Sequence, residues 1–140
     1  NWFGSSGDRR AEIEKLLDFS GLGDRSNYKA KNLSFGEQRR LELARAIASK
    51  PKLIVLDEPA AGMNREEVRD LKIRILTMKD LGMTVLLVEH VMELVMNVTD
   101  RIVVLNFGKK IAEGTPAEIQ NNPLVQKAYF GFATNSDGSD

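Results

Sequence analysis

The sequence has no cysteine, only 4 prolines, no surplus of either charge and no long apolar run. Without cysteine the chain can form neither a disulfide framework nor a thiolate metal site. Its 20 basic and 20 acidic side chains cancel, whereas a polyanion binder needs an excess of Lys and Arg, so we expect no nucleic-acid partner. The apolar runs are far shorter than the about 18 residues that cross a bilayer, and no secretory signal is recognisable at the start.

The residues that are present suit a folded domain. Apolar residues make up 42% of the 140 positions and charged residues 29%, a balance that supports a hydrophobic core. Small and polar residues gather at both ends. We therefore expect a flexible lead-in over residues 1–7, a folded part over residues 8–133 and a disordered tail over residues 134–140.

The apolar patterning predicts an α/β fold. Leu53–Leu56 and Thr84–Val88 are continuous apolar runs, which is typical of strands buried on both faces. A helical pattern over residues 65–80 separates these two runs, and strands that alternate with helices indicate a mostly parallel sheet with flanking helices. Near the end, Asn106–Lys109 has the composition of a hairpin turn that follows a third strand.

Two carboxylates stand directly after the first predicted strand. Asp57 and Glu58 would lie at the carboxyl tip of that strand, where ligands bind in open α/β sheets. Neighbouring side chains at a strand end point in different directions, so Asp57 can serve a Mg²⁺ shell while Glu58 faces an attacking water. The alternative is a solvated acidic turn; the buried run before the pair and Pro59 after it favour the functional interpretation.

A second candidate segment lies at a predicted helix start. Ser34 and Gly36 open a helix whose free N–H groups and dipole favour an anion, and Gly36 lets a phosphate approach the backbone. The alternative is an ordinary capping box of Ser34 with Glu37 and no ligand. His90, the sole histidine, follows the second predicted strand as Asp57 follows the first; the alternative there is a structural histidine.

Taken together, these segments resemble the motifs of ABC transporter ATP-binding subunits. Leu33–Arg40 resembles the signature motif, Leu53–Pro59 the Walker B motif, Ala60–Asn64 the D-loop and His90 the switch histidine, in the family's order. The resemblance covers residues 10–131 and implies the C-terminal half of such a domain. Residues 59–64 and 108–116 resemble the subunits that energise branched-chain amino-acid importers, and Pro123 and residues 128–131 continue that likeness.

The resemblance implies a role for each matching residue. Ser34 and Gly36 would contact the γ-phosphate of ATP on the opposite subunit, with Glu37 beside them where the family usually has Gln. Asp57 would hold Mg²⁺ through water.

Within the same resemblance, Glu58 would polarise the hydrolytic water, and His90 would sense the γ-phosphate. Asn64 stands where the D-loop usually has Asp. The implied cofactors are therefore ATP and Mg²⁺, and Glu37 would weaken ATP binding slightly unless it turns away to cap the helix.

The phosphate-cradling Walker A motif, G-x-x-x-x-G-K-[ST], is not found in the 140 residues. The Gly-Lys pair at positions 108 and 109 does not match it, because Lys110 stands where the motif has Ser or Thr. We therefore expect a partial P-loop NTPase-like fold that binds ATP weakly or not at all and does not hydrolyse it alone. The resemblance implies a membrane-embedded permease, a second ATP-binding subunit and a cytoplasmic location at the inner face of the membrane.

Three interpretations of the function remain open. The chain is part of an importer ATPase, a non-catalytic module that dimerises through an exposed sheet face, or an ATPase head from a DNA-repair relative. The short interval between the signature-like and Walker B-like segments has no heptad pattern, and with the neutral charge this disfavours the third.

Overall fold

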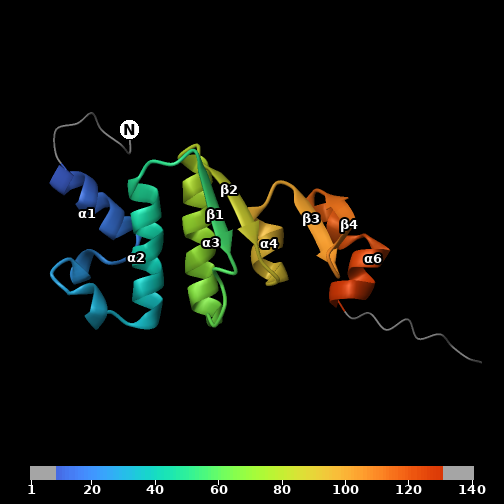
Figure 1. The fold of residues 1–140 in the computed structure, drawn as a ribbon, viewed down its shortest axis with the longest axis horizontal. Coiled ribbons are helices and arrows are strands. Elements are labelled where there is room, and N and C mark those ends of the chain that lie inside the picture. The colour runs from blue at the N-terminus through green and yellow to red at the C-terminus, as the bar shows by residue number, and fades with distance from the viewer. Residues whose placement is uncertain (1–8, 131–140) are drawn as a thin grey trace, which may run out of the picture. The chain divides into compact units, whose positions relative to one another are not determined.

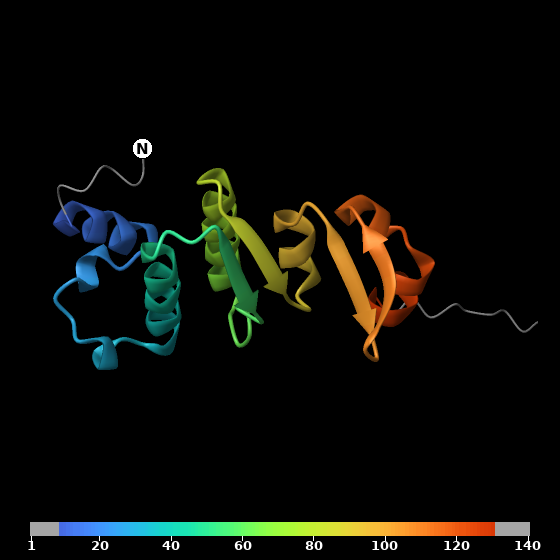
Figure 2. The same ribbon diagram turned by 45° about the horizontal axis from the view of Figure 1, so that its top comes forward.

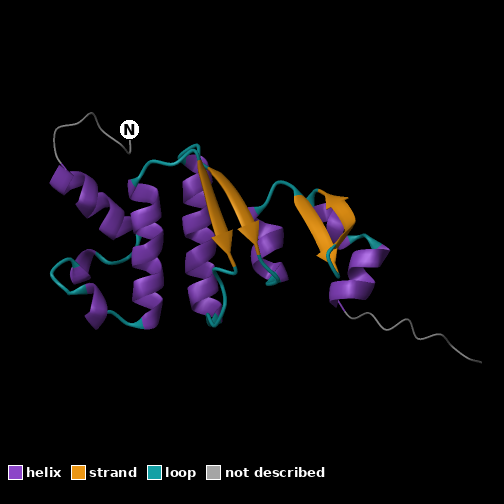
Figure 3. Ribbon diagram, in the orientation of Figure 1, coloured by secondary structure: helices purple, strands orange, loops and turns teal. Residues whose placement is uncertain are grey.

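The computed structural model describes residues 9–130, which form two units that divide after His90. Within this part of the chain, helices and strands alternate as the sequence predicts (Figures 1 and 3). The expected lead-in over residues 1–7 and tail over residues 134–140 lie outside the described residues. Among residues 9–130, no helix has both the length and the apolar content needed to span a bilayer.

The first unit opens with two helices that pack together, α1 (Arg9–Phe19) and α2 (Phe35–Ala48). Gly21 ends α1 with φ of +63°, a left-handed conformation that glycine adopts without steric cost, while the N–H of Leu22 bonds back to Leu17. Two short 3-10 turns, η1 (Gly23–Arg25) and η2 (Ala30–Asn32), lead to the start of α2.

The remaining elements of the first unit are β1 (Leu53–Asp57), α3 (Arg65–Asp80) and β2 (Thr84–Val88). The strands pair in parallel, with Leu53 opposite Thr84 and Asp57 opposite Val88, and α3 packs against β2 (Figure 2). The buried apolar side chains of this unit form its core. They are Leu16, Leu22, Leu33, Ala44, Ile47, Ile54, Ala60, Leu71, Ile75, Met78 and Met83.

One prediction about these strands is wrong: they are not buried on both faces. Leu53 and Val55 of β1 are 53% and 57% exposed, and Leu86 and Val88 of β2 are 53% and 52% exposed. Successive side chains of a strand point to opposite faces of the sheet, and the described residues cover one face of this sheet better than the other. A continuous apolar run therefore does not by itself show that both faces of a strand are covered.

The second unit contains α4 (Met92–Val98), β3 (Ile102–Asn106), β4 (Lys109–Gly114), α5 (Pro116–Gln120), α6 (Pro123–Val125) and a π-helical turn, η3 (Gln126–Phe130). The expected hairpin is confirmed, because β3 and β4 pair antiparallel around Phe107 and Gly108. The hairpin forms its own two-stranded sheet, so the described residues contain two small sheets rather than one continuous sheet.

Candidate functional site

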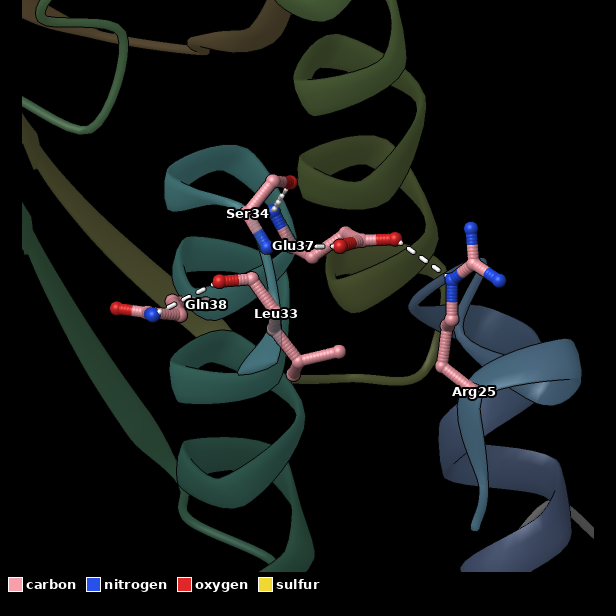
Figure 4. Close-up of polar contacts among 5 residues, drawn as sticks. All are labelled: Arg25, Leu33, Ser34, Glu37 and Gln38. Atoms are coloured by element: carbon pink, nitrogen blue, oxygen red, sulfur yellow. Dashed lines mark hydrogen bonds and ion pairs between the residues drawn. The ribbon is translucent and has the colours of Figure 1, made fainter. Parts of the chain in front are cut away.

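The start of α2 is held by a complete capping box. The Ser34 hydroxyl accepts a hydrogen bond from the N–H of Glu37 at 3.3 Å, and the N–H of Ser34 donates to Oε2 of Glu37 at 2.8 Å (Figure 4). Gln38 donates from its side-chain amide to the Leu33 carbonyl at 3.0 Å. The capping box weighed in the sequence is therefore present.

The Glu37 side chain contacts Arg25 as well as Ser34. Its Oε1 lies 2.9 Å from Nε of Arg25, an ion pair between a largely buried carboxylate and a partly exposed guanidinium (Figure 4). The hydrogen bond from the Ser34 backbone, together with those from Arg25 and the Ser34 hydroxyl, lowers the pKa of Glu37 from 4.5 to about 2. Glu37 is therefore fully ionised at neutral pH.

The two acidic residues after the first strand lie at the carboxyl end of the parallel pair. Asp57 is the last residue of β1, and the next N–H, that of Glu58, donates to the Val88 carbonyl at 2.8 Å. Glu58 has φ of +45°, a left-handed conformation that costs a residue with a side chain about 1–2 kcal/mol. Such strain is typical of functional positions and re-aims the side chain at the strand end.

Glu58 and His90 lie next to each other. Nδ1 of His90 is 3.7 Å from Oε1 of Glu58, and both side chains are more than half exposed to solvent. A protonated imidazole at this distance attracts the carboxylate, whereas a neutral one can share a water or a ligand atom with it. The structure thus brings together two of the residues that the sequence singled out.

Glu89 clamps the loop after Glu58 to the end of β2. Its side chain is fully buried; Oε1 accepts from the N–H of Ala60 at 2.8 Å, and Oε2 accepts from the N–H of His90 at 2.8 Å. Sequence reasoning missed this role, because the available signal was only the position of Glu89 between the strand and the histidine.

Asn64 has a structural task of its own. Its side-chain oxygen accepts from the N–H groups of Glu66 and Glu67, and Glu67 reaches back to the N–H of Asn64 at 2.9 Å. A Cβ atom placed on Gly36 would lie 3.2 Å from Oε1 of Glu67. The starts of α2 and α3 are therefore neighbours, and glycine at position 36 permits this approach.

A cavity of about 310 Å³ lies between α2, β1 and α3 within the first unit. Ser34 and Gly36 contribute to its wall from one side and Asp57 from another. Asn64, Glu58 and His90 are not among the lining residues, so the candidate residues divide between this cavity and the adjacent strand end.

The carboxylate available at the cavity suits a metal ion that keeps most of its coordinated waters. Among the described residues, no three His, Cys, Asp or Glu side chains gather closely enough to hold a metal alone. Asp57 offers one carboxylate at the cavity, and Mg²⁺ commonly binds through one or two carboxylates, with waters and substrate phosphates completing the octahedron. The residues therefore fit Mg²⁺ bound together with a polyphosphate.

Comparisons with known proteins agree with this arrangement. Residues 4–61 match the family described as ABC transporter, and residues 109–131 match the family described as branched-chain amino acid ATP-binding cassette transporter. The chain is therefore similar to ABC transporter ATP-binding proteins over both of these segments. The family resemblance inferred from the motifs is thereby confirmed.

The proteins that this chain resembles are longer than it is. It is 46% identical to the high-affinity branched-chain amino acid transport ATP-binding protein LivG of Salmonella typhimurium, over 89% of the chain and 52% of LivG. It is 36% identical to the lipopolysaccharide export system ATP-binding protein LptB of Haemophilus influenzae, over 88% of the chain and 51% of LptB. The chain thus spans about half the length of these relatives.

Solved structures show the same fold. The ADP conformation of MJ1267, an ATP-binding cassette of an ABC transporter, matches with a TM-score of 0.76 and 32% identity, covering 94% of this chain and 53% of that one. A nucleotide-free ATP-binding cassette matches with a TM-score of 0.74 and 34% identity, covering 89% and 51%. The predicted α/β fold, a part of the ABC ATPase fold, is confirmed.

The strain at Glu58 predicts an unusual stability effect. Replacing Glu58 by glycine removes the left-handed penalty, so the free energy of unfolding should rise by about 0.5–1 kcal/mol in urea denaturation. Glu58→Gln keeps a side chain at the same φ and should leave stability unchanged. If Glu58→Gly and Glu58→Gln were equally stable, the left-handed conformation of residue 58 would carry no steric penalty.

The clamp at Glu89 predicts a loss of stability. Glu89→Ala leaves the buried N–H of Ala60 without its acceptor, which should lower the free energy of unfolding by about 1–3 kcal/mol. Glu66→Ala, an exposed glutamate of the same unit, is the matched control and should stay within about 0.5 kcal/mol of wild type. A wild-type unfolding midpoint for Glu89→Ala would show that the clamp contributes nothing.

Proposed function

We propose that this chain supplies the water-activating and signature parts of an ABC importer ATPase that couples ATP hydrolysis to uptake of branched-chain amino acids or similar solutes. The observation that carries the proposal is the meeting of Asp57, Glu58 and His90 at the carboxyl end of one parallel strand pair, with Glu58 held in a left-handed conformation. The 46% identity to a protein named for branched-chain amino acid transport supports the solute class.

In this proposal each candidate residue has a distinct task. Asp57 holds Mg²⁺ through water, and bound Mg²⁺ supplies charge stabilisation to the transferring phosphoryl group. The Glu58 carboxylate accepts a hydrogen bond from the attacking water and orients it. His90, 3.7 Å from Glu58, lies close enough to share contacts with the same γ-phosphate.

The signature segment would act on ATP held by a second ATP-binding subunit. Ser34 presents its hydroxyl group and Gly36 a backbone without a side chain at the N-terminal end of α2, where the helix dipole favours negative charge. Asn64, at the start of α3 beside this segment, would take the D-loop position. In the assembled transporter the pair would dock on a membrane-embedded permease at the cytoplasmic face.

By itself the 140-residue chain would neither bind ATP tightly nor turn it over. The support is the sequence, which carries no G-x-x-x-x-G-K-[ST] segment to cradle the phosphates. Each missing charge-assisted hydrogen bond removes about 1.5–3 kcal/mol, and several of them lower affinity by orders of magnitude.

Titration calorimetry and a coupled ATPase assay test both halves of this proposal. The 140-residue chain should show no micromolar Mg-ATP binding. A chimera with the N-terminal half of LivG placed before Asn1 should hydrolyse ATP, because the phosphate grip is restored. In that chimera Glu58→Gln should lower kcat at least about 100-fold, the usual contribution of a general base.

Glu14→Gln is the matched control, because Glu14 is an exposed glutamate of α1 that pairs with Arg10. It should leave the turnover of the chimera unchanged. Micromolar ATP binding by the chain alone would refute the claim of inactivity, and a chimera whose turnover is indifferent to Glu58→Gln would refute the role of Glu58.

A second candidate function, a self-associating module, is favoured by the uncovered sheet face. Val55 and Leu86 stand opposite each other in the parallel register and are both more than half exposed. Light scattering should therefore detect dimers of the chain. The double substitution Val55→Thr with Leu86→Thr keeps strand-compatible residues on β1 and β2 and should shift the population toward monomer.

Ile73→Gln is the control for this experiment, because Ile73 is an exposed apolar residue on α3 rather than on the sheet. It should leave the dimer intact. A clean wild-type monomer at tens of micromolar would eliminate the self-associating module while leaving the ATPase proposal untouched.

A further inference from the structure

Arg25 connects the turn before the signature segment to the start of α2. Its Nε donates to Oε1 of Glu37 at 2.9 Å, and its guanidinium lies 4.9 Å from the centre of the Tyr28 ring. Arg25 is the last residue of η1, twelve positions before Glu37. Figure 4 shows the guanidinium reaching across to the capping carboxylate.

Glu37 has both carboxylate oxygens committed by this arrangement. Oε2 accepts from the backbone of Ser34 at 2.8 Å, and Oε1 accepts from Arg25. The same glutamate also donates its own N–H to the Ser34 hydroxyl. Glu37 and Ser34 therefore belong to the same capping box, so the negative charge of Glu37 lies close to the hydroxyl that would contact a phosphate.

A carboxylate so close to an anion site opposes anion binding unless a cation offsets its charge. At a protein surface, like charges several ångströms apart repel each other. Arg25 supplies the opposing charge and at the same time holds the Glu37 side chain in its capping orientation.

We propose that Arg25 is a positioning residue for the phosphate contact of Ser34: it locks Glu37 into the capping box and cancels the charge of Glu37 beside the incoming anion. This inference rests on the proposed function, because it assigns Arg25 to the phosphate-facing end of α2. Arg25 acts through Glu37 in this proposal, because its Nε donates to that carboxylate and its guanidinium lies over the Tyr28 ring.

The experiment uses the full 140-residue chain and inorganic tripolyphosphate as the probe. Titration followed by the amide NMR signals of residues 34–37 gives an apparent Kd for the start of α2. Arg25→Gln should weaken binding about three- to tenfold. Arg25→Lys keeps the charge but not the same donor geometry and should recover part of the loss.

The double variant Arg25→Gln with Glu37→Gln distinguishes an effect of the uncompensated Glu37 charge on binding from a loss of folding caused by removing Arg25. Removing both charges should restore the apparent Kd to that of wild type or lower, because no uncompensated carboxylate remains. Arg10→Gln, which removes the exposed arginine that pairs with Glu14, is the control and should not alter binding.

The titration of Glu37 gives an independent readout. With its pKa at about 2, its capping contribution is complete above pH 4.5 and is lost as the pH falls toward 2. In Arg25→Gln the pKa of Glu37 should rise, because one of its hydrogen bonds and the neighbouring positive charge are gone, so the loss should begin at a higher pH. A capping glutamate independent of Arg25 would keep its midpoint.

The outcomes are distinguishable. Tripolyphosphate binding that survives Arg25→Gln unchanged, or a double variant as weak as the single one, overturns the role of Arg25 and leaves the proposed function standing. A wild-type chain with no saturable response overturns the phosphate contact of Ser34 itself, and with it the role of Arg25 in that contact.

Discussion

The parallel hydrogen bonding between β1 and β2 sets the position of every group at the strand end. It brings Asp57 opposite Val88, and the ladder continues one step further through the N–H of Glu58. That additional bond holds Glu58 in its left-handed conformation, and the buried carboxylate of Glu89 then holds Ala60 and His90 on either side. The separation of Glu58 from His90 thus follows from backbone pairing rather than from their mutual attraction.

Local capping supports the rest of the structure. Three helices begin with the same reciprocal arrangement, in which a side chain at the N-cap and a glutamate three residues later satisfy each other's backbone donors: Ser34 with Glu37, Asn64 with Glu67, and Thr115 with Glu118. In α2 and α3 these starts coincide with the candidate phosphate-facing segments. The same bonds that begin the helices therefore orient the residues proposed to act on nucleotide.

Elements encoded by short-range pattern could be predicted from the sequence. The helix over residues 65–80, the strand over residues 84–88 and the cap at Ser34 agree with the structure, because periodicity and capping act within a few residues. The left-handed backbone of Glu58 could not be foreseen, since neither its own side chain nor its neighbours demand it. The Arg25–Glu37 pair depends on the path of two 3-10 turns, which no local pattern specifies.

The close approach of Gly36 to Glu67 links two helices that are far apart along the chain. A side chain at position 36 would press on the same carboxylate that satisfies the N–H of Asn64. An alanine at position 36 would require Oε1 of Glu67 to move by a few tenths of an ångström. Because the other oxygen of Glu67 accepts from the N–H of Asn64, a substitution at the start of α2 would reach the start of α3 through a single glutamate.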